Sequence, residues 1–146
     1  MSRIRIELPE RLPFQCRIAL RVTDMNYGGH VGNDRILALA HEARVQFLQS
    51  LGYEELDLAG VGLIMTDAAI EFKQELFYGD ELLVEVGAGD ATRVGFDLYY
   101  RLVKKGPAGT ATAAKVKTGM VCYDYSLKKI VPLPHTARER LECNQA

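Results

Sequence analysis

Residues 21–52 read RVTDMNYGGHVGNDRILALAHEARVQFLQSLG, a turn-rich loop followed by one long stretch with helical periodicity. Apolar residues recur at helical spacing within this stretch, at Ile36, Ala40, Ala43, Phe47 and Leu51. Asn33 is suited to the N-cap of the helix, and Gly52 is suited to stop it. The sequence therefore predicts one long helix from about residue 33 to residue 51.

The segments on either side of this helix have the apolar–polar alternation of strands. Before the loop, Phe14–Thr23 alternates, and one face carries Cys16, Ile18, Leu20 and Val22. After the helix, further strands are predicted at Leu63–Leu76, Glu81–Gly89, Val94–Lys104 and Thr110–Tyr125. Within the first of these, Ile70, Phe72 and Leu76 are expected to point inward. Short turns separate the last four strands, so we expect them to form an antiparallel meander, and we expect a short helix after Pro134.

One strand, one long helix and four further strands predict an α+β fold. In that class, a five-stranded antiparallel sheet can wrap around a single central helix. Ala38, Ala40 and Ala43 would allow such a sheet to approach the helix backbone closely, although alanine also simply favours helix.

Composition indicates a single domain spanning residues 1–146, because 48% of the residues are apolar and the chain has room for only one core. The net charge of −1 does not favour binding to nucleic acid or to an anionic membrane surface. No apolar run has the length of a signal peptide or a membrane span, so we expect a cytoplasmic protein. The three cysteines lack the spacing of zinc ligands, and no metal site is predicted.

The stretch 21–52 resembles the signature of the 4-hydroxybenzoyl-CoA thioesterase family. That signature is an Asp-x-Asp-x-x-Gly-His-Val-Asn-Asn loop followed by a helix that contains Glu-Ala-Arg. The later segment Ile70–Val86, IEFKQELFYGDELLVEV, is also similar to this family. The resemblance implies a hot-dog fold, a dimer whose sheets join edge to edge, and an acyl-CoA thioester cleft at the subunit interface. It implies no cofactor, because CoA would be part of the substrate.

The loop itself is suited to holding a thioester carbonyl. Glycines allow a close backbone approach, and the first turn of the helix has unpaired N–H groups that would stabilise an oxyanion. The candidate substrate-binding residues are therefore Tyr27, Gly28, Gly29, His30, Val31 and Asn33. For the glycine pair alone, a tight turn is the better interpretation, and the adjoining residues that match the family favour a functional role.

The departure from the family signature that matters for the chemistry is at Asn26. Aligning Gly29-His30-Val31 with the family's Gly-His-Val places Asp24 on the first carboxylate and Asn26 on the second. In the best-known members, the second carboxylate activates water or attacks the carbonyl. An amide does neither, although Asn26 could orient a water molecule or donate a hydrogen bond to an oxyanion.

Three carboxylates could replace the missing one. Asp24 could serve as the base, or could instead cap N–H groups of its own loop. Glu42 could reach the cleft from the helix, or could instead form an ion pair with Arg44 or a neighbouring strand. Asp67 could approach from the second strand, or could satisfy a nearby backbone donor. His30 has a supporting role in this interpretation.

Two functions follow from these residues. The first is an acyl-CoA thioesterase that acts as a homodimer or a pair of dimers. The second is a non-catalytic module that binds acyl-CoA or acyl-carrier protein, which the amide at Asn26 favours. A hot-dog hydratase would need an Asp/His pair beside the helix, and the sequence has no convincing pair at the required loop position.

Overall fold

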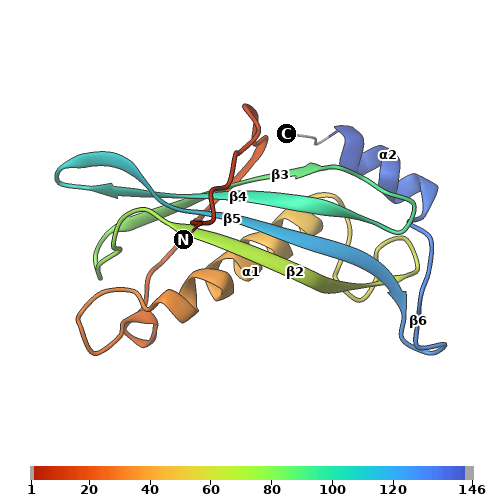
Figure 1. The fold of residues 1–146 in the computed structure, drawn as a ribbon, viewed down its shortest axis with the longest axis horizontal. Coiled ribbons are helices and arrows are strands. Elements are labelled where there is room, and N and C mark those ends of the chain that lie inside the picture. Colours follow the sequence, from red (N-terminus) through yellow and green to blue (C-terminus); the bar gives the residue numbers. More distant parts are fainter. Residues whose placement is uncertain (1, 144–146) are drawn as a thin grey trace.

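The computed structural model describes residues 2–143 and has a single antiparallel sheet curved over one long helix (Figure 1). The strands are β1 (Phe14–Ile18), β2 (Gly62–Phe72), β3 (Glu81–Gly89), β4 (Gly95–Gly106), β5 (Gly109–Asp124) and β6 (Lys129–Ile130). The helices are the 3₁₀ turn η1 (Val22–Asp24), the central α1 (Asn33–Ser50) and the C-terminal α2 (His135–Cys143). The predicted α+β class, the central helix and the helix after Pro134 are confirmed. The sheet has the five predicted strands and, in addition, the short β6 on β5.

The order of strands in the sheet is β1-β3-β4-β5-β2. Strands β3, β4 and β5 form the predicted meander, but the prediction that β2 precedes them in it is wrong. Strand β2 pairs with β5, with Ile70 opposite Val116, and so lies at the edge of the sheet. The chain after β2 crosses to β3 through residues 73–80. This crossover is held by Val31, whose N–H donates to the Leu76 carbonyl at 2.8 Å.

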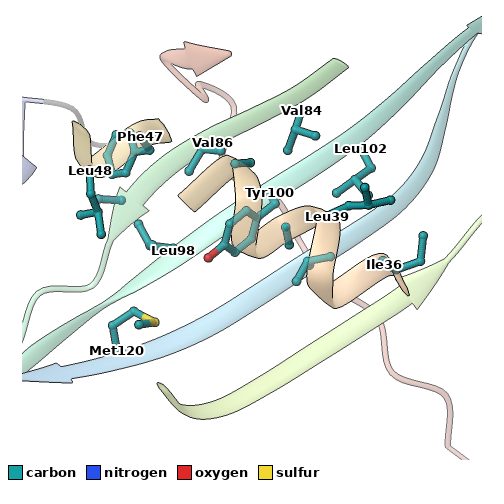
Figure 2. Close-up of a cluster of buried hydrophobic side chains, with 14 of the residues drawn as sticks. Ile36, Leu39, Phe47, Leu48, Val84, Val86, Leu98, Tyr100, Leu102 and Met120 are labelled. Atoms are coloured by element: carbon teal, nitrogen blue, oxygen red, sulfur yellow. The ribbon is translucent and has the colours of Figure 1, made fainter. Parts of the chain in front are cut away.

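The core lies between α1 and the concave face of the sheet. Figure 2 shows Phe47, Leu48, Ile36 and Leu39 of the helix among the side chains of β3, β4 and β5. Ala40 and Ala43 are completely buried, so the helix backbone lies close to the sheet as predicted, whereas Ala38 is exposed on the opposite face. Burial of the apolar stripe on α1 is the main stabilising contribution to this packing.

Some boundaries and orientations differ from those predicted. Helix α1 begins at Asn33 with Gly32 in the N-cap position, so Asn33 is not the cap. Gly52 follows the helix with φ of 82°, a left-handed conformation that glycine adopts without strain. The first strand ends at Ile18, and Val22 is 71% exposed in the turn that follows. Phe72 is 51% exposed, because it lines an open pocket at the end of β2.

No helix within residues 2–143 has both the length and the hydropathy needed to cross a membrane.

Candidate active site

Asn26 organises the loop that precedes α1. Its Oδ1 accepts a hydrogen bond from the Gly28 N–H at 2.8 Å and a longer one from the His30 N–H at 3.4 Å. Its own N–H donates to the His30 carbonyl at 2.8 Å, which closes the loop. The amide at the position of the missing carboxylate therefore holds the loop in shape through local hydrogen bonds.

The internal hydrogen bonds of the loop decide which N–H groups remain for a ligand. The N–H groups of Gly28 and His30 donate to the Asn26 side chain, and the Gly29 N–H donates to the Asn26 carbonyl at 3.1 Å. The Val31 N–H donates to Leu76. The prediction that the glycine loop supplies oxyanion donors is therefore wrong for these four N–H groups, because each already has an acceptor.

The first turn of α1 supplies the donors that the loop lacks. The Arg35 N–H donates to the Gly32 carbonyl at 2.9 Å, whereas the N–H groups of Asn33 and Asp34 have no acceptor among residues 2–143. Both lie at the positive end of the helix dipole. This turn is the part of the site best suited to stabilise an oxyanion.

A pocket of about 270 Å³ opens between the start of α1 and the crossover after β2, and we call it the β2-side pocket. Its apolar wall consists of Val31, Ile36, Phe72, Leu76 and Ala113. Its polar rim consists of His30, Asn33, Lys73, Gln74 and Glu75. Apolar side chains together with polar groups that can fix the orientation of a ligand are found in small-molecule sites.

His30 stands at the mouth of the β2-side pocket. Its Nδ1 is 3.0 Å from the Val31 carbonyl oxygen, and its Nε2 is 3.8 Å from Oε1 of Glu75. The ring of Phe77 lies edge-on to the imidazole, with the centroids 6.4 Å apart. Tyr27, at the tip of the same loop, is fully exposed. Glu75 was not predicted as a site residue, because the crossover that brings it to the loop is not evident from the sequence.

Asp24 and Glu42 line a different depression, the β1-side groove, on the opposite side of the helix start. This groove has a volume of about 280 Å³ and is bordered by Arg17, Arg21 and Arg35. The Asp24 carboxylate is buried and accepts a hydrogen bond from the Arg21 N–H at 2.9 Å. This contact matches the alternative interpretation of Asp24 as a residue that caps its own loop.

Glu42 is exposed in the β1-side groove, where its carboxylate accepts a hydrogen bond from Gln46 at 3.3 Å. The ion pair with Arg44, one alternative for Glu42, does not form. Arg44 points into the protein instead, and its Nε donates to Glu55 at 2.8 Å. The two residues lie on different faces of α1, which explains why sequence proximity does not pair them.

Asp67 lies away from both Asp24 and Glu42. Its Oδ2 is 2.6 Å from Nζ of Lys117 on β5, and Lys117 is also 3.5 Å from Asp97 on β4. The hydrogen bond from Lys117 lowers the pKa of Asp67 below its ordinary value. Within a single chain, the structure therefore brings Asp24 and Glu42 to one groove, His30 and Asn33 to one pocket, and Asp67 to neither.

The described part of the chain contains no group of three or more His, Cys, Asp or Glu residues that could hold a metal ion.

Comparison with known proteins identifies the family. The family model of the thioesterase-like superfamily matches residues 20–141, which include the loop, α1 and strands β2 to β5. The chain belongs to the thioesterase-like superfamily. The resemblance of the loop and helix to a thioesterase signature is thereby confirmed.

The chain is similar to several known proteins over most of their length. A 1,4-dihydroxy-2-naphthoyl-CoA hydrolase from Microcystis aeruginosa is 29% identical over 133 residues, which cover 89% of this chain and 92% of that protein. A thioesterase from Thermus thermophilus, solved with coenzyme A and zinc, has a TM-score of 0.79 at 23% identity and covers 94% of this chain and 98% of its own.

A hypothetical protein from Aquifex aeolicus has a TM-score of 0.78 at 26% identity, with coverage of 88% and 99%. These likenesses confirm the hot-dog fold.

Proposed function

We propose that this member of the thioesterase-like superfamily hydrolyses acyl-CoA thioesters to the free acid and CoA. The observation that carries the proposal is the pair of unpaired N–H groups on Asn33 and Asp34, at the start of a helix that borders an apolar pocket. A thioester carbonyl becomes an oxyanion when water attacks it, and preorganised donors lower the free energy of that state. The name of the Microcystis relative, a hydrolase of an acyl-CoA thioester, supports the same reaction class.

In this proposal, the acyl group occupies the β2-side pocket and contacts Ile36, Phe72 and Ala113. The thioester carbonyl then points to the first turn of α1. Attack of water on the carbonyl carbon gives the oxyanion, and its collapse breaks the carbon–sulfur bond and releases CoA as the thiolate. Asn26 contributes by fixing the loop, and Asp24, Glu42 and His30 are the candidates for the water-activating group.

We also propose that the site lies at a homodimer interface formed by β2. This strand is at the edge of the sheet, and within residues 2–143 no strand pairs with its outer side. An edge with unpaired backbone groups favours pairing with a second copy in an isologous dimer. Since Phe72 belongs both to β2 and to the pocket wall, a partner at this edge would help to enclose the substrate. Two such dimers could pair further.

The test is release of CoA from short, medium, long and aromatic acyl-CoAs, followed with a thiol reagent. Turnover of at least one thioester supports the proposed function. Burial raises the pKa of the Cys122 thiol to about 11, so Cys122 should not react with the thiol reagent in the folded protein. Cys143 is exposed, and a blank without substrate corrects for its reaction with the reagent.

The second candidate function is a non-catalytic module that binds acyl-CoA or acyl-carrier protein. It is favoured by the position of Asn26, whose side-chain oxygen is already occupied by its own loop. Binding of CoA in calorimetry, together with no release from any thioester, would support this module over the enzyme. Turnover that appears only in Asn26→Asp would support it further.

A further inference from the structure

The hydrogen bonds of His30 fix which of its ring nitrogens is available to a ligand. Its Nδ1 lies 3.0 Å from the Val31 carbonyl oxygen. A carbonyl oxygen only accepts hydrogen bonds, so Nδ1 must carry the proton of the neutral ring. The unprotonated nitrogen is then Nε2, the atom that faces Glu75.

Nε2 of His30 and Oε1 of Glu75 are placed so that one water molecule beside them could bridge the two atoms. Their separation of 3.8 Å is too long for a direct hydrogen bond between them. Both atoms are acceptors when the ring is neutral, so a single water could donate one proton to each. Both residues line the β2-side pocket, which Asn33 also lines.

We propose that His30 is the general base of this site and that Glu75 is its positioning partner. The proposal rests on the proposed function, since it assigns the water-activating group for thioester hydrolysis. Nε2 takes a proton from water as the water oxygen bonds to the carbonyl carbon. The Glu75 carboxylate stabilises the imidazolium that forms. When the carbon–sulfur bond breaks, the imidazolium returns its proton to the thiolate, which restores neutral His30 and gives the CoA thiol.

The surroundings of His30 support a fixed ring. The Val31 hydrogen bond holds one edge, and Phe77 packs edge-on against the imidazole. Of the nearby cations, Lys73 is 2.8 Å from Glu71, and Lys104 donates to the Glu75 carbonyl at 2.9 Å and lies over the Phe77 ring at 5.5 Å. Glu75 is therefore the charged group with a direct approach to Nε2.

The two carboxylates of the β1-side groove are less well placed. The Asp24 carboxylate is buried and engaged by the Arg21 backbone, and Glu42 lies two turns into α1 on the other side of the helix start. Neither lines the pocket that contains Asn33. The loss of the family's second carboxylate is thus compensated by a base from the same loop.

The decisive variant is His30→Gln, whose amide keeps a polar side chain at this position but cannot take up a proton. We expect kcat for CoA release to fall about 10²–10⁴-fold with KM little changed, as is usual on removal of a general base. His135→Gln, on the exposed face of α2, is the matched control and should retain wild-type turnover. Glu75→Gln should lower kcat by a smaller factor and add little in the double variant with His30→Gln.

A second experiment separates catalysis from structure. In His30→Ala, free imidazole can occupy the vacated space, and we expect it to restore part of kcat in a concentration-dependent way, which a purely structural role would not allow. Wild-type turnover in folded His30→Gln would overturn the assignment of the base and leave the proposed function standing. Failure of the wild type to release CoA from any thioester would overturn the proposed function and the base with it.

Discussion

Oδ1 of Asn26 lies 2.8 Å from the backbone nitrogen of Gly28 and accepts its hydrogen bond. This contact gives a structural role to Asn26, which stands where the thioesterase signature has its second carboxylate. The residue that would carry a catalytic carboxylate shapes the loop instead. The shaped loop places His30 at the mouth of the β2-side pocket.

Removal of the Asn26 side chain should loosen the loop. Asn26→Ala leaves the N–H groups of Gly28 and His30 without their acceptor, which we expect to cost about 1 kcal/mol in the free energy of unfolding. Asn26→Asp retains an acceptor oxygen and should unfold close to the wild type in urea. Equal urea midpoints for the alanine variant and the wild type would show that the loop does not depend on this contact.

Substitution of Asp24 and Glu42 should show whether either residue is needed for turnover. Asp24→Asn keeps an oxygen for the Arg21 N–H and should retain both stability and turnover, whereas Asp24→Ala should lose about 1 kcal/mol. Glu42→Gln should leave kcat within about threefold of the wild type if water is activated from the other side of the helix start. Loss of turnover in folded Asp24→Asn would identify Asp24 as the base in place of His30.

A chain of polar side chains crosses the core beneath α1. Thr118 Oγ1 is 2.7 Å from the Tyr100 hydroxyl, which is 3.3 Å from Arg44, and Arg44 donates to Glu55. Tyr100→Phe removes the middle of this chain at a fully buried position, so we expect about 1–3 kcal/mol of destabilisation in urea unfolding. Tyr99→Phe, on the opposite face of β4, is the control and should cost less, because its hydroxyl contacts Asp90 at an exposed site.

The ion pair between Asp67 and Lys117 should make the free energy of unfolding depend on pH in the acidic range. The hydrogen bond from Lys117 lowers the folded-state pKa of Asp67 below 3.8. The stabilisation is therefore fully present above pH 3.8 and is lost as the pH falls through the lower folded-state pKa. Burial raises the pKa of the neighbouring Asp97, which acts in the opposite direction.

Urea unfolding between about pH 3 and 6 tests this contribution. We expect the wild type to be more stable than Asp67→Asn at pH 6 and the difference to shrink as the solution is acidified. A difference that stays constant over this range would contradict a role for the charge of Asp67.

If two copies of the chain pair through β2, a charge introduced in the middle of this strand should weaken the dimer. Ala68 is exposed near the middle of β2, and in an isologous antiparallel dimer, residues near the middle face their own copies. Ala68→Lys should therefore shift the molar mass in light scattering from dimer towards monomer and reduce CoA release. Thr110→Lys, an exposed site on β5 beyond the end of β2, should do neither. A dimer that withstands Ala68→Lys at micromolar concentration would place the interface elsewhere.

Local information was enough to predict the elements and the family. Apolar spacing predicted α1 from about residue 33 to residue 51, close to its observed bounds, and alternation predicted Glu81–Gly89 to the residue. The loop signature predicted a hot-dog thioesterase. The signature could be recognised from the sequence because all its residues lie in one continuous stretch, the loop and the helix that follows it. The same local reasoning identified Asn26 as the departure from the usual chemistry.

Tertiary structure decided what depends on distant partners. The placement of β2 beside β5 is a pairing between segments far apart in the chain, and no periodicity encodes it. Likewise, the crossover after β2 brings Glu75 to His30, and the hydrogen bonds of the folded loop occupy the N–H groups of Gly28 and Gly29. Sequence patterns report which face of an element is apolar. Which polar atoms meet, and which remain unpaired, depends on how those faces pack together.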